Sequence, residues 1–207
     1  MTLSDRINGW LRRVPPWAIY VAGFLYAAWY FWLGLTGGLG PEPINTLERE
    51  YGQTAIQLLI AGLAVTPLRR FAGINLLRFR RAIGVTCFFF VLAHLSVWAL
   101  LDVQALGRVW ADILKRPYIT IGMGAFLLLL PLAVTSNNLS IRKLGPKWRQ
   151  LHKLVYPAAI LAAVHFIWLV KGFPWEPFIY AGIIAVLLGL RLVPRKRPKP
   201  VARQVAS

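Results

Sequence analysis

Apolar runs long enough to cross a lipid bilayer dominate this chain of 207 residues. A membrane-spanning helix needs about 20 predominantly apolar residues, because each residue adds about 1.5 Å of rise across a hydrocarbon layer of roughly 30 Å. Six runs approach or reach that length, at about 17–35, 53–67, 80–101, 118–135, 150–170 and 177–193. The second run is short, and we expect it to need flanking residues or a thinner bilayer. The sequence therefore predicts an all-α integral membrane bundle of six transmembrane helices over residues 1–193.

Composition excludes a soluble domain, a disulfide-bonded scaffold and a removable leader peptide. Apolar residues make up 57% of the chain and charged residues only 15%, which is typical of an integral membrane protein. The single cysteine, Cys87, lies inside an apolar run and excludes both a disulfide framework and a cysteine-ligated metal. The first run is too long for the apolar core of a signal peptide and lacks a small-residue cleavage site, so we expect a retained span.

The formal net charge of +17 reflects the orientation of the helices rather than binding to nucleic acid. Nineteen of the Lys and Arg residues fall in the N-terminal segment, two alternate loops and the C-terminal segment from Arg191 onward, whereas only five fall in the other loops. Cytoplasmic segments carry the excess of Lys and Arg, so both termini are predicted to be cytoplasmic. The basic tail, 194–207, is predicted to be disordered and to contact anionic membrane lipids.

All three histidines lie inside apolar runs, where ionisable side chains are rare and usually functional. With the predicted orientation, His94 lies about 20 Å and His165 about 24 Å from the cytoplasmic face, on different helices. Two imidazoles at similar depth across a bundle core provide the pair of axial ligands that a six-coordinate b-type haem requires. We therefore predict that His94 and His165 bind one haem b.

His152 is predicted only about 5 Å from the cytoplasmic face. It is either an ordinary interfacial histidine, a ligand of a second haem, or a residue at the place where electrons enter. Arg78, Arg80 and Arg81 are predicted at the same depth and suit haem propionates, a flavin phosphate or a quinone, unless they serve only as topology determinants. Pro157 follows His152 in the same run and can kink or rephase that helix.

Membrane histidines have two other uses, which are an interhelical hydrogen bond and a proton relay in a small transporter. The matched depth of His94 and His165, and the absence of Asp or Glu partners within the predicted spans, favour haem. The acid-poor interior and the absence of broken-helix repeats count against transport. Haem ligation is therefore the preferred interpretation, and the relay is the alternative.

Two long stretches carry a resemblance to a known family. RFRRAIGVTCFFFVLAHLSVWALLD (78–102) and LAVTSNNLSIRKLGPKWRQLHKLVYPAAILAAVHFIWLV (132–170) resemble the ferric-reductase-like transmembrane superfamily, in which histidines on paired helices hold haem. More closely, the chain is similar to the haem-binding membrane subunits of bacterial methionine sulfoxide reductase systems. The stretches that carry this closer likeness are GGLGPEP, TAIQLLIAGLAVTPLRR, RPYITIGM and LGPKWRQLHKLVY.

The resemblance implies an electron-transfer function with separate partners. Electrons come from the membrane quinol pool or a cytoplasmic flavin reductase and cross the bacterial inner membrane by haem. They leave to a periplasmic molybdopterin-containing methionine sulfoxide reductase subunit that repairs oxidised proteins. His94, His152 and His165 match the histidines of the family. FMN is also associated with the family, although no flavin motif is found in this sequence.

The sequence departs from the NADPH oxidases of the superfamily. It lacks the second histidine of the pair on the 80–101 run and any C-terminal FAD/NADPH domain, so direct NADPH oxidation is not expected. A stand-alone transmembrane ferric or cupric reductase is the alternative within the superfamily. That alternative predicts metal reduction by the purified subunit without a periplasmic partner.

Overall fold

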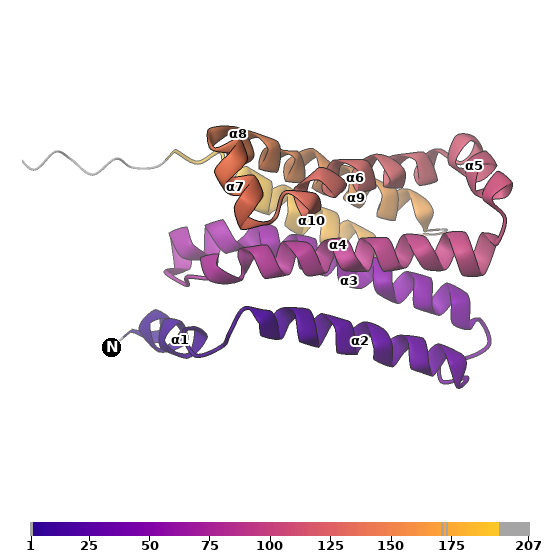
Figure 1. Cartoon of the computed structure of the whole chain (residues 1–207), viewed down its shortest axis with the longest axis horizontal. Coiled ribbons are helices and arrows are strands. Elements are labelled where there is room, and N and C mark those ends of the chain that lie inside the picture. Colours follow the sequence, from indigo (N-terminus) through magenta and orange to yellow (C-terminus); the bar gives the residue numbers. More distant parts are fainter. Residues whose placement is uncertain (1, 171, 173, 195–207) are drawn as a thin grey trace, which may run out of the picture.

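The computed structural model describes residues 2–170, 172 and 174–194, and this described part contains helices and no strand. The prediction of the all-α class is therefore confirmed (Figure 1). The α-helices are α1 (Leu3–Leu11), α2 (Trp17–Leu35), α3 (Pro43–Pro67), α4 (Arg80–Ser96), α5 (Leu106–Lys115), α6 (Pro117–Val134), α7 (Asn138–Leu144), α8 (Pro146–Leu151), α9 (Val155–Leu169) and α10 (Trp175–Gly189). Apart from Pro194, the predicted tail over 194–207 lies outside the described residues.

Short segments of other helix types extend or join the α-helices. The π-helical segments Leu68–Ala72 and Val97–Val103 continue α3 and α4. The 3₁₀ turns Leu77–Phe79 and His152–Leu154 precede α4 and α9. The backbone of Pro157 has no N–H to donate to the residue one helical turn earlier. The 3₁₀ turn before α9 lies at that point and interrupts the predicted run over 150–170, in which Pro157 is expected to kink or rephase the helix.

Within the part of the chain that the structure describes, five helical stretches are long and apolar enough to cross a membrane, which makes the chain a multi-pass membrane protein. They are Trp17–Leu35, Pro43–Ala72, Leu77–Val103, Pro117–Val134 and Pro146–Leu169. The sixth predicted span, 177–193, corresponds to α10, which is apolar but has only 15 residues. At about 1.5 Å per residue, a helix of that length covers roughly 22 Å and is shorter than a typical hydrocarbon layer.

The prediction of a short second span at 53–67 is wrong. The helical stretch runs over Pro43–Ala72 and has 30 residues. Charged residues near the start of this helix lower its mean hydropathy, so the apolar run alone does not include its first turns. Leu47 and Tyr51 in these turns are nevertheless buried against the bundle. The Tyr51 hydroxyl donates a hydrogen bond to the Ala27 carbonyl of α2 at 2.7 Å, so its buried polar group is satisfied.

The bundle is built from two antiparallel helix pairs with one further helix against each (Figure 1). α3 packs along α4, and α6 packs along α9. α2 lies against α4 and α3, whereas α10 lies against α9 and α3. Buried residues of α3, α4, α6, α9 and α10 form one hydrophobic cluster, in which Leu63, Ala158 and Ala159 are almost completely buried.

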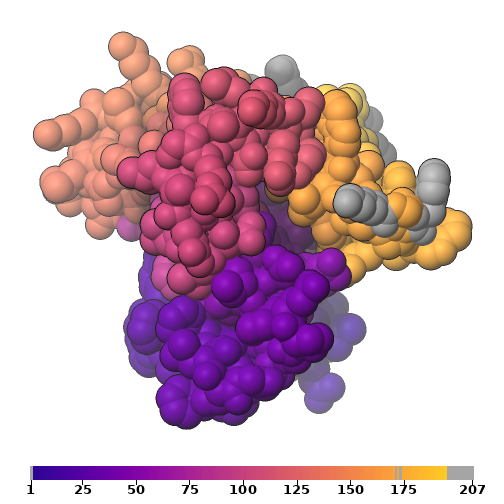
Figure 2. Space-filling model, turned by 90° about the vertical axis from the view of Figure 1, so that its right-hand side faces the viewer, coloured from indigo at the N-terminus to yellow at the C-terminus, as the bar shows by residue number. Residues whose placement is uncertain are grey.

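The connecting segments fall into two groups at opposite ends of the bundle. α1, α7 and α8 lie at the end where the described chain also starts and stops, whereas the α2–α3 turn and α5 lie at the other end (Figure 1). Figure 2 views the molecule from that other end, where the α2–α3 turn, α5 and the start of α10 are at the surface. Among the described residues, the N-terminal segment, residues 68–81 and the segment between α6 and α9 therefore share one end of the molecule, and together they carry thirteen Lys and Arg residues.

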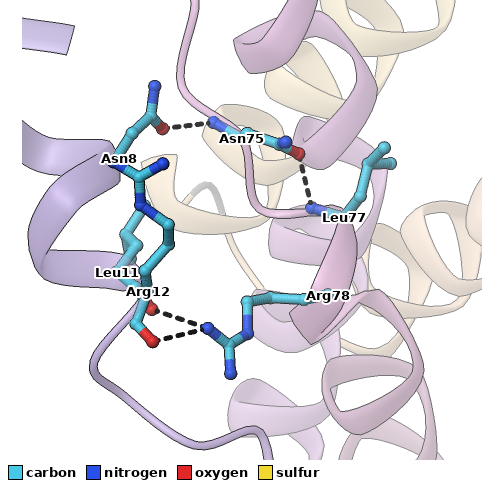
Figure 3. Close-up of a pocket in the computed structure, with 6 residues that line it drawn as sticks. All are labelled: Asn8, Leu11, Arg12, Asn75, Leu77 and Arg78. Carbon is cyan, nitrogen blue, oxygen red and sulfur yellow. Dashed lines mark hydrogen bonds between the residues drawn. The ribbon is translucent and has the colours of Figure 1, made fainter. Parts of the chain in front are cut away.

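Helix α1 is a short amphipathic segment that the loop before α4 holds in place (Figure 3). The Asn8 side chain donates to the Gly73 carbonyl at 2.9 Å and accepts from the Asn75 backbone N–H at 2.8 Å. At its start, Thr2 and Asp5 form a capping box, and the hydrogen bonds from Thr2 lower the pKa of the Asp5 carboxyl from its ordinary value.

Candidate functional site

His94 on α4 and His165 on α9 lie together in the interior of the bundle. The centres of their imidazole rings are 6.4 Å apart, and the two ring planes are inclined by 73°. Both side chains are partly buried. Two histidines that are far apart in the sequence are thus brought to one place at the same depth.

Each of the two rings donates a hydrogen bond to a backbone carbonyl of a neighbouring helix. His94 Nδ1 lies 2.9 Å from the Glu48 carbonyl oxygen of α3, and His165 Nδ1 lies 2.7 Å from the Tyr118 carbonyl oxygen of α6. A carbonyl oxygen only accepts hydrogen bonds, so the proton of each neutral ring resides on Nδ1. Nε2, on the far side of each ring from its carbonyl, is therefore left with a free lone pair for a metal ion.

The spacing of the two rings fits one metal ion bound between them. Two imidazoles that bind a metal through Nε2 at about 2 Å from opposite sides have ring centres roughly 6 Å apart. The 6.4 Å separation of His94 and His165 matches this arrangement. Two axial imidazoles leave four equatorial positions of a six-coordinate iron for the porphyrin nitrogens, so the pair fits a bis-histidine haem.

The same geometry weakens the two alternatives to haem. Among the hydrogen bonds of the described residues, none joins His94 to His165, and each Nδ1 proton is already given to a backbone carbonyl. In this tautomer each neutral ring keeps only an acceptor nitrogen for the other, so a direct hydrogen bond or a proton transfer between the rings requires a further proton. A shared Lewis acid satisfies both nitrogen atoms at once.

His152 lies in a different place, beside a cavity of about 570 Å³ between α3, α4, α6 and α9. It precedes His165 by thirteen residues, which corresponds to roughly 20 Å along the helix direction. We call this space the His152 cavity; its polar and aromatic lining includes Arg78, Arg80, Arg81, Trp148, His152 and Arg191. The structure thus places His152 and the three predicted arginines around one space, apart from the His94–His165 pair.

The His152 ring is fixed by Trp148, one turn earlier in the chain. The two rings stack with centres 3.8 Å apart, and His152 Nδ1 donates to the Trp148 carbonyl at 3.1 Å. His152 Nε2 is buried, and within the described part of the protein it has no hydrogen-bond partner. Buried polar atoms normally have a hydrogen-bond partner, and a group bound in the adjoining cavity can supply one for this nitrogen.

Two of the predicted arginines already make contacts within the protein. Arg78 Nη1 donates to the carbonyls of Leu11, at 3.4 Å, and Arg12, at 2.8 Å, at the end of α1 (Figure 3). Arg81 Nη2 donates to Asn138 Oδ1 at 2.9 Å. Each guanidinium keeps further N–H groups for an anionic group, so these contacts are compatible with both a structural and a ligand-binding role.

Arg191 is a residue of the His152 cavity that sequence reasoning counted only as a topology determinant. Its Nη2 donates to the Leu63 carbonyl at 2.6 Å and its Nη1 to the Tyr156 hydroxyl at 3.0 Å. Its Nε is buried and has no hydrogen-bond partner among the residues that the structure describes. The position of Arg191 at the end of an apolar run is the one sequence signal that could have identified it, because Arg is rarely buried unless it has a partner.

The comparisons with known proteins agree with this site. Residues 50–163 match the family described as ferric reductase like transmembrane component. The matched range includes His94 and His152 and ends two residues before His165. A relative from Brucella anthropi is 50% identical over 191 residues, covering 90% of this chain and 86% of its own. A relative from Brucella ovis is 51% identical over 177 residues, covering 85% and 80%.

Both relatives are named protein-methionine-sulfoxide reductase heme-binding subunit MsrQ. No solved structure matches the chain. The family match covers more than half of the sequence, and the two relatives align with most of it. The chain therefore belongs to the ferric-reductase-like transmembrane family and, within it, to the MsrQ family.

Proposed function

We propose that this protein is a b-type cytochrome subunit that passes electrons across the bacterial inner membrane. The recipient is a periplasmic molybdopterin-containing methionine sulfoxide reductase, which repairs oxidised proteins. The observation that carries the proposal is the His94–His165 pair, with ring centres 6.4 Å apart and both Nδ1 atoms tied to backbone carbonyls. The names of the relatives, which mention haem and methionine sulfoxide reductase, support the same function.

His94 and His165 are the proposed axial ligands. Haem supplies the reversible one-electron change of its iron when it is bound. The backbone carbonyls of Glu48 and Tyr118 each accept a hydrogen bond from the Nδ1–H group of one histidine. These hydrogen bonds orient the two imidazoles and make them stronger electron donors to a metal. Stronger axial donors favour the oxidised iron, so these contacts lower the potential of the site.

The His152 cavity is the proposed place where electrons are taken up. His152 Nε2 and Arg191 Nε are buried and unpaired there within the described structure, and Arg80 is among the residues that line it. This set of donors and one imidazole suits a second haem with its propionates, the head group of a quinol, or the phosphate of FMN. The donor is then the quinol pool or a cytoplasmic flavin reductase.

The proposed topology has six spans with both termini in the cytoplasm. α10 is short, yet its polar contacts fix it to α3: Gln53 donates to Glu176, and Gln57 donates to the Tyr180 hydroxyl at 2.8 Å. Elements at the end of the bundle that carries α1, α7 and α8 hold the excess of Lys and Arg, which is the cytoplasmic side by the positive-inside rule.

Reconstitution with the periplasmic reductase tests this function. We expect vesicles that contain the protein to oxidise a quinol analogue, or reduced flavin from a flavin reductase, only when the purified reductase and methionine sulfoxide are both present. His94→Ala is expected to lower this rate at least about 100-fold through loss of a ligand, whereas Arg142→Gln, on the exposed surface of α7, retains it. Equally fast reduction of an iron(III) chelate without the reductase contradicts the proposal and favours a stand-alone ferric reductase.

A further inference from the structure

The rings of His94 and His165 occupy two places that are built in the same way. In each place, the Nδ1 atom of the histidine donates to the backbone carbonyl of a residue on a neighbouring helix. The residue four positions after that carbonyl residue is a glycine. The first place has the Glu48 carbonyl and Gly52 on α3; the second has the Tyr118 carbonyl and Gly122 on α6. The histidine follows its carbonyl partner by 46 residues in one case and by 47 in the other.

The two glycines leave the space that the imidazole rings fill. A Cβ atom on Gly52 would lie 3.0 Å from Nδ1 and 3.2 Å from Cε1 of His94. A Cβ atom on Gly122 would lie 2.8 Å from Nδ1 and 2.9 Å from Cε1 of His165. Real Cβ contacts are essentially never shorter than 3.0 Å, so any other residue at position 122 forces the ring to move.

The spacing of four residues between carbonyl and glycine has a reason in helix geometry. In an α-helix the carbonyl of residue i accepts the N–H of residue i+4, so the side chain of residue i+4 lies close to that carbonyl. A carbonyl oxygen has a second lone pair, and a histidine reaches it only where no side chain stands in the way. Glycine at i+4 therefore exposes the carbonyls of Glu48 and Tyr118 to the two Nδ1 atoms.

We propose that Gly52 and Gly122 are positioning residues for the two axial ligands. Each glycine allows its histidine ring to reach the carbonyl, which fixes Nε2 as the ligating atom and sets how strongly the imidazole donates to iron. The proposal rests on the proposed function, because it concerns the orientation of haem ligands.

Two glycines that lie away from both histidines and do not line the His152 cavity provide matched controls. A Cβ on Gly182 of α10 meets no neighbouring atom within 4 Å. A Cβ on Gly124 of α6 comes within 3.4 Å of Leu161 Cδ1, the end of a flexible side chain. Gly182→Ala and Gly124→Ala therefore make the same chemical change within helices, away from both histidines and from the His152 cavity.

The test measures the haem itself in purified full-length protein carrying Gly52→Ala, Gly122→Ala, Gly182→Ala or Gly124→Ala. We expect the first two variants to show a raised midpoint potential and altered low-spin EPR g-values, or a partial loss of the low-spin signal. The effect should be larger for Gly122→Ala, where the contact is shorter. The two control variants should keep the potential and g-values of the wild type.

Three outcomes overturn the proposal. If all four variants share the wild-type potential and g-values, or if the controls shift as much as Gly52→Ala and Gly122→Ala, the glycines do not position the ligands. If Gly122→Ala cannot be recovered as monodisperse protein, the test uses Gly52→Ala, whose added Cβ lies farther from its histidine ring. The midpoint potential and the EPR g-values of that variant then decide. A wild type that binds no haem overturns the proposed function as well, which separates that failure from the failure of this inference alone.

Discussion

At the scale of single residues, the chemistry depends on which nitrogen of each histidine carries the proton. The carbonyls of Glu48 and Tyr118 place that proton on Nδ1 of His94 and His165, so Nε2 remains for iron. The sequence could predict that these two histidines lie at a similar depth on different helices, because depth in the membrane follows from the helix rise and the charge pattern. It could not predict which groups accept the Nδ1 hydrogen bonds, since every residue has a backbone carbonyl and no residue type marks the ones that are used.

Arg191 gives a prediction at the same scale. Arg191→Gln removes one of the four arginines that line the His152 cavity, together with its hydrogen bonds to the Leu63 carbonyl and the Tyr156 hydroxyl. Losing partners of buried polar groups costs about 1–3 kcal/mol, so we expect a melting temperature lower by several degrees and reduced binding of any anionic cofactor in the cavity. Arg142→Gln, on an exposed face, is the matched control for thermal unfolding and cofactor content. Equal melting temperatures for the two variants contradict the prediction.

At the scale of elements, the sequence predicted the centres of the helices better than their ends. Hydropathy located the apolar runs, but α3 begins earlier than expected because its first turns are polar and still packed in the bundle. Helix α5 was not predicted, because its mixed sequence lies between two spans. The divided helix before α9 follows from Pro157, which the sequence did single out, although the position and type of the break required the structure.

The attachment of α1 gives a prediction at this scale. Asn8→Ala removes both hydrogen bonds between α1 and the loop that contains Gly73 and Asn75. Each hydrogen bond contributes about 1 kcal/mol, so we expect faster hydrogen–deuterium exchange in α1 and in that loop, by about 10-fold or more. Exchange in α9, far from α1 in the bundle, serves as the internal control. Unchanged exchange in α1 indicates that the remaining bonds, from Arg78 to the end of the helix, are sufficient.

At the scale of the whole molecule, two sites lie at different depths of one bundle. The His152 cavity is near the end that carries α1, α7 and α8, and the His94–His165 pair is roughly 20 Å farther along α9. The interior between them is formed by the apolar cluster of α3, α4, α6, α9 and α10. Such an arrangement suits a protein that takes up electrons at one face and delivers them at the other.

The most direct test of the central claim is the optical spectrum of purified protein, oxidised and then reduced with dithionite, together with the haem content per chain. Wild type, His94→Ala, His165→Ala and His152→Ala are compared after expression with ample haem. We predict a low-spin b-type spectrum in the wild type that is lost in His94→Ala and His165→Ala. In His152→Ala the bis-histidine signal should persist, and any fall in haem content measures a second haem in the His152 cavity. A colourless wild type, or a spectrum that survives both His94→Ala and His165→Ala unchanged, contradicts haem ligation by this pair.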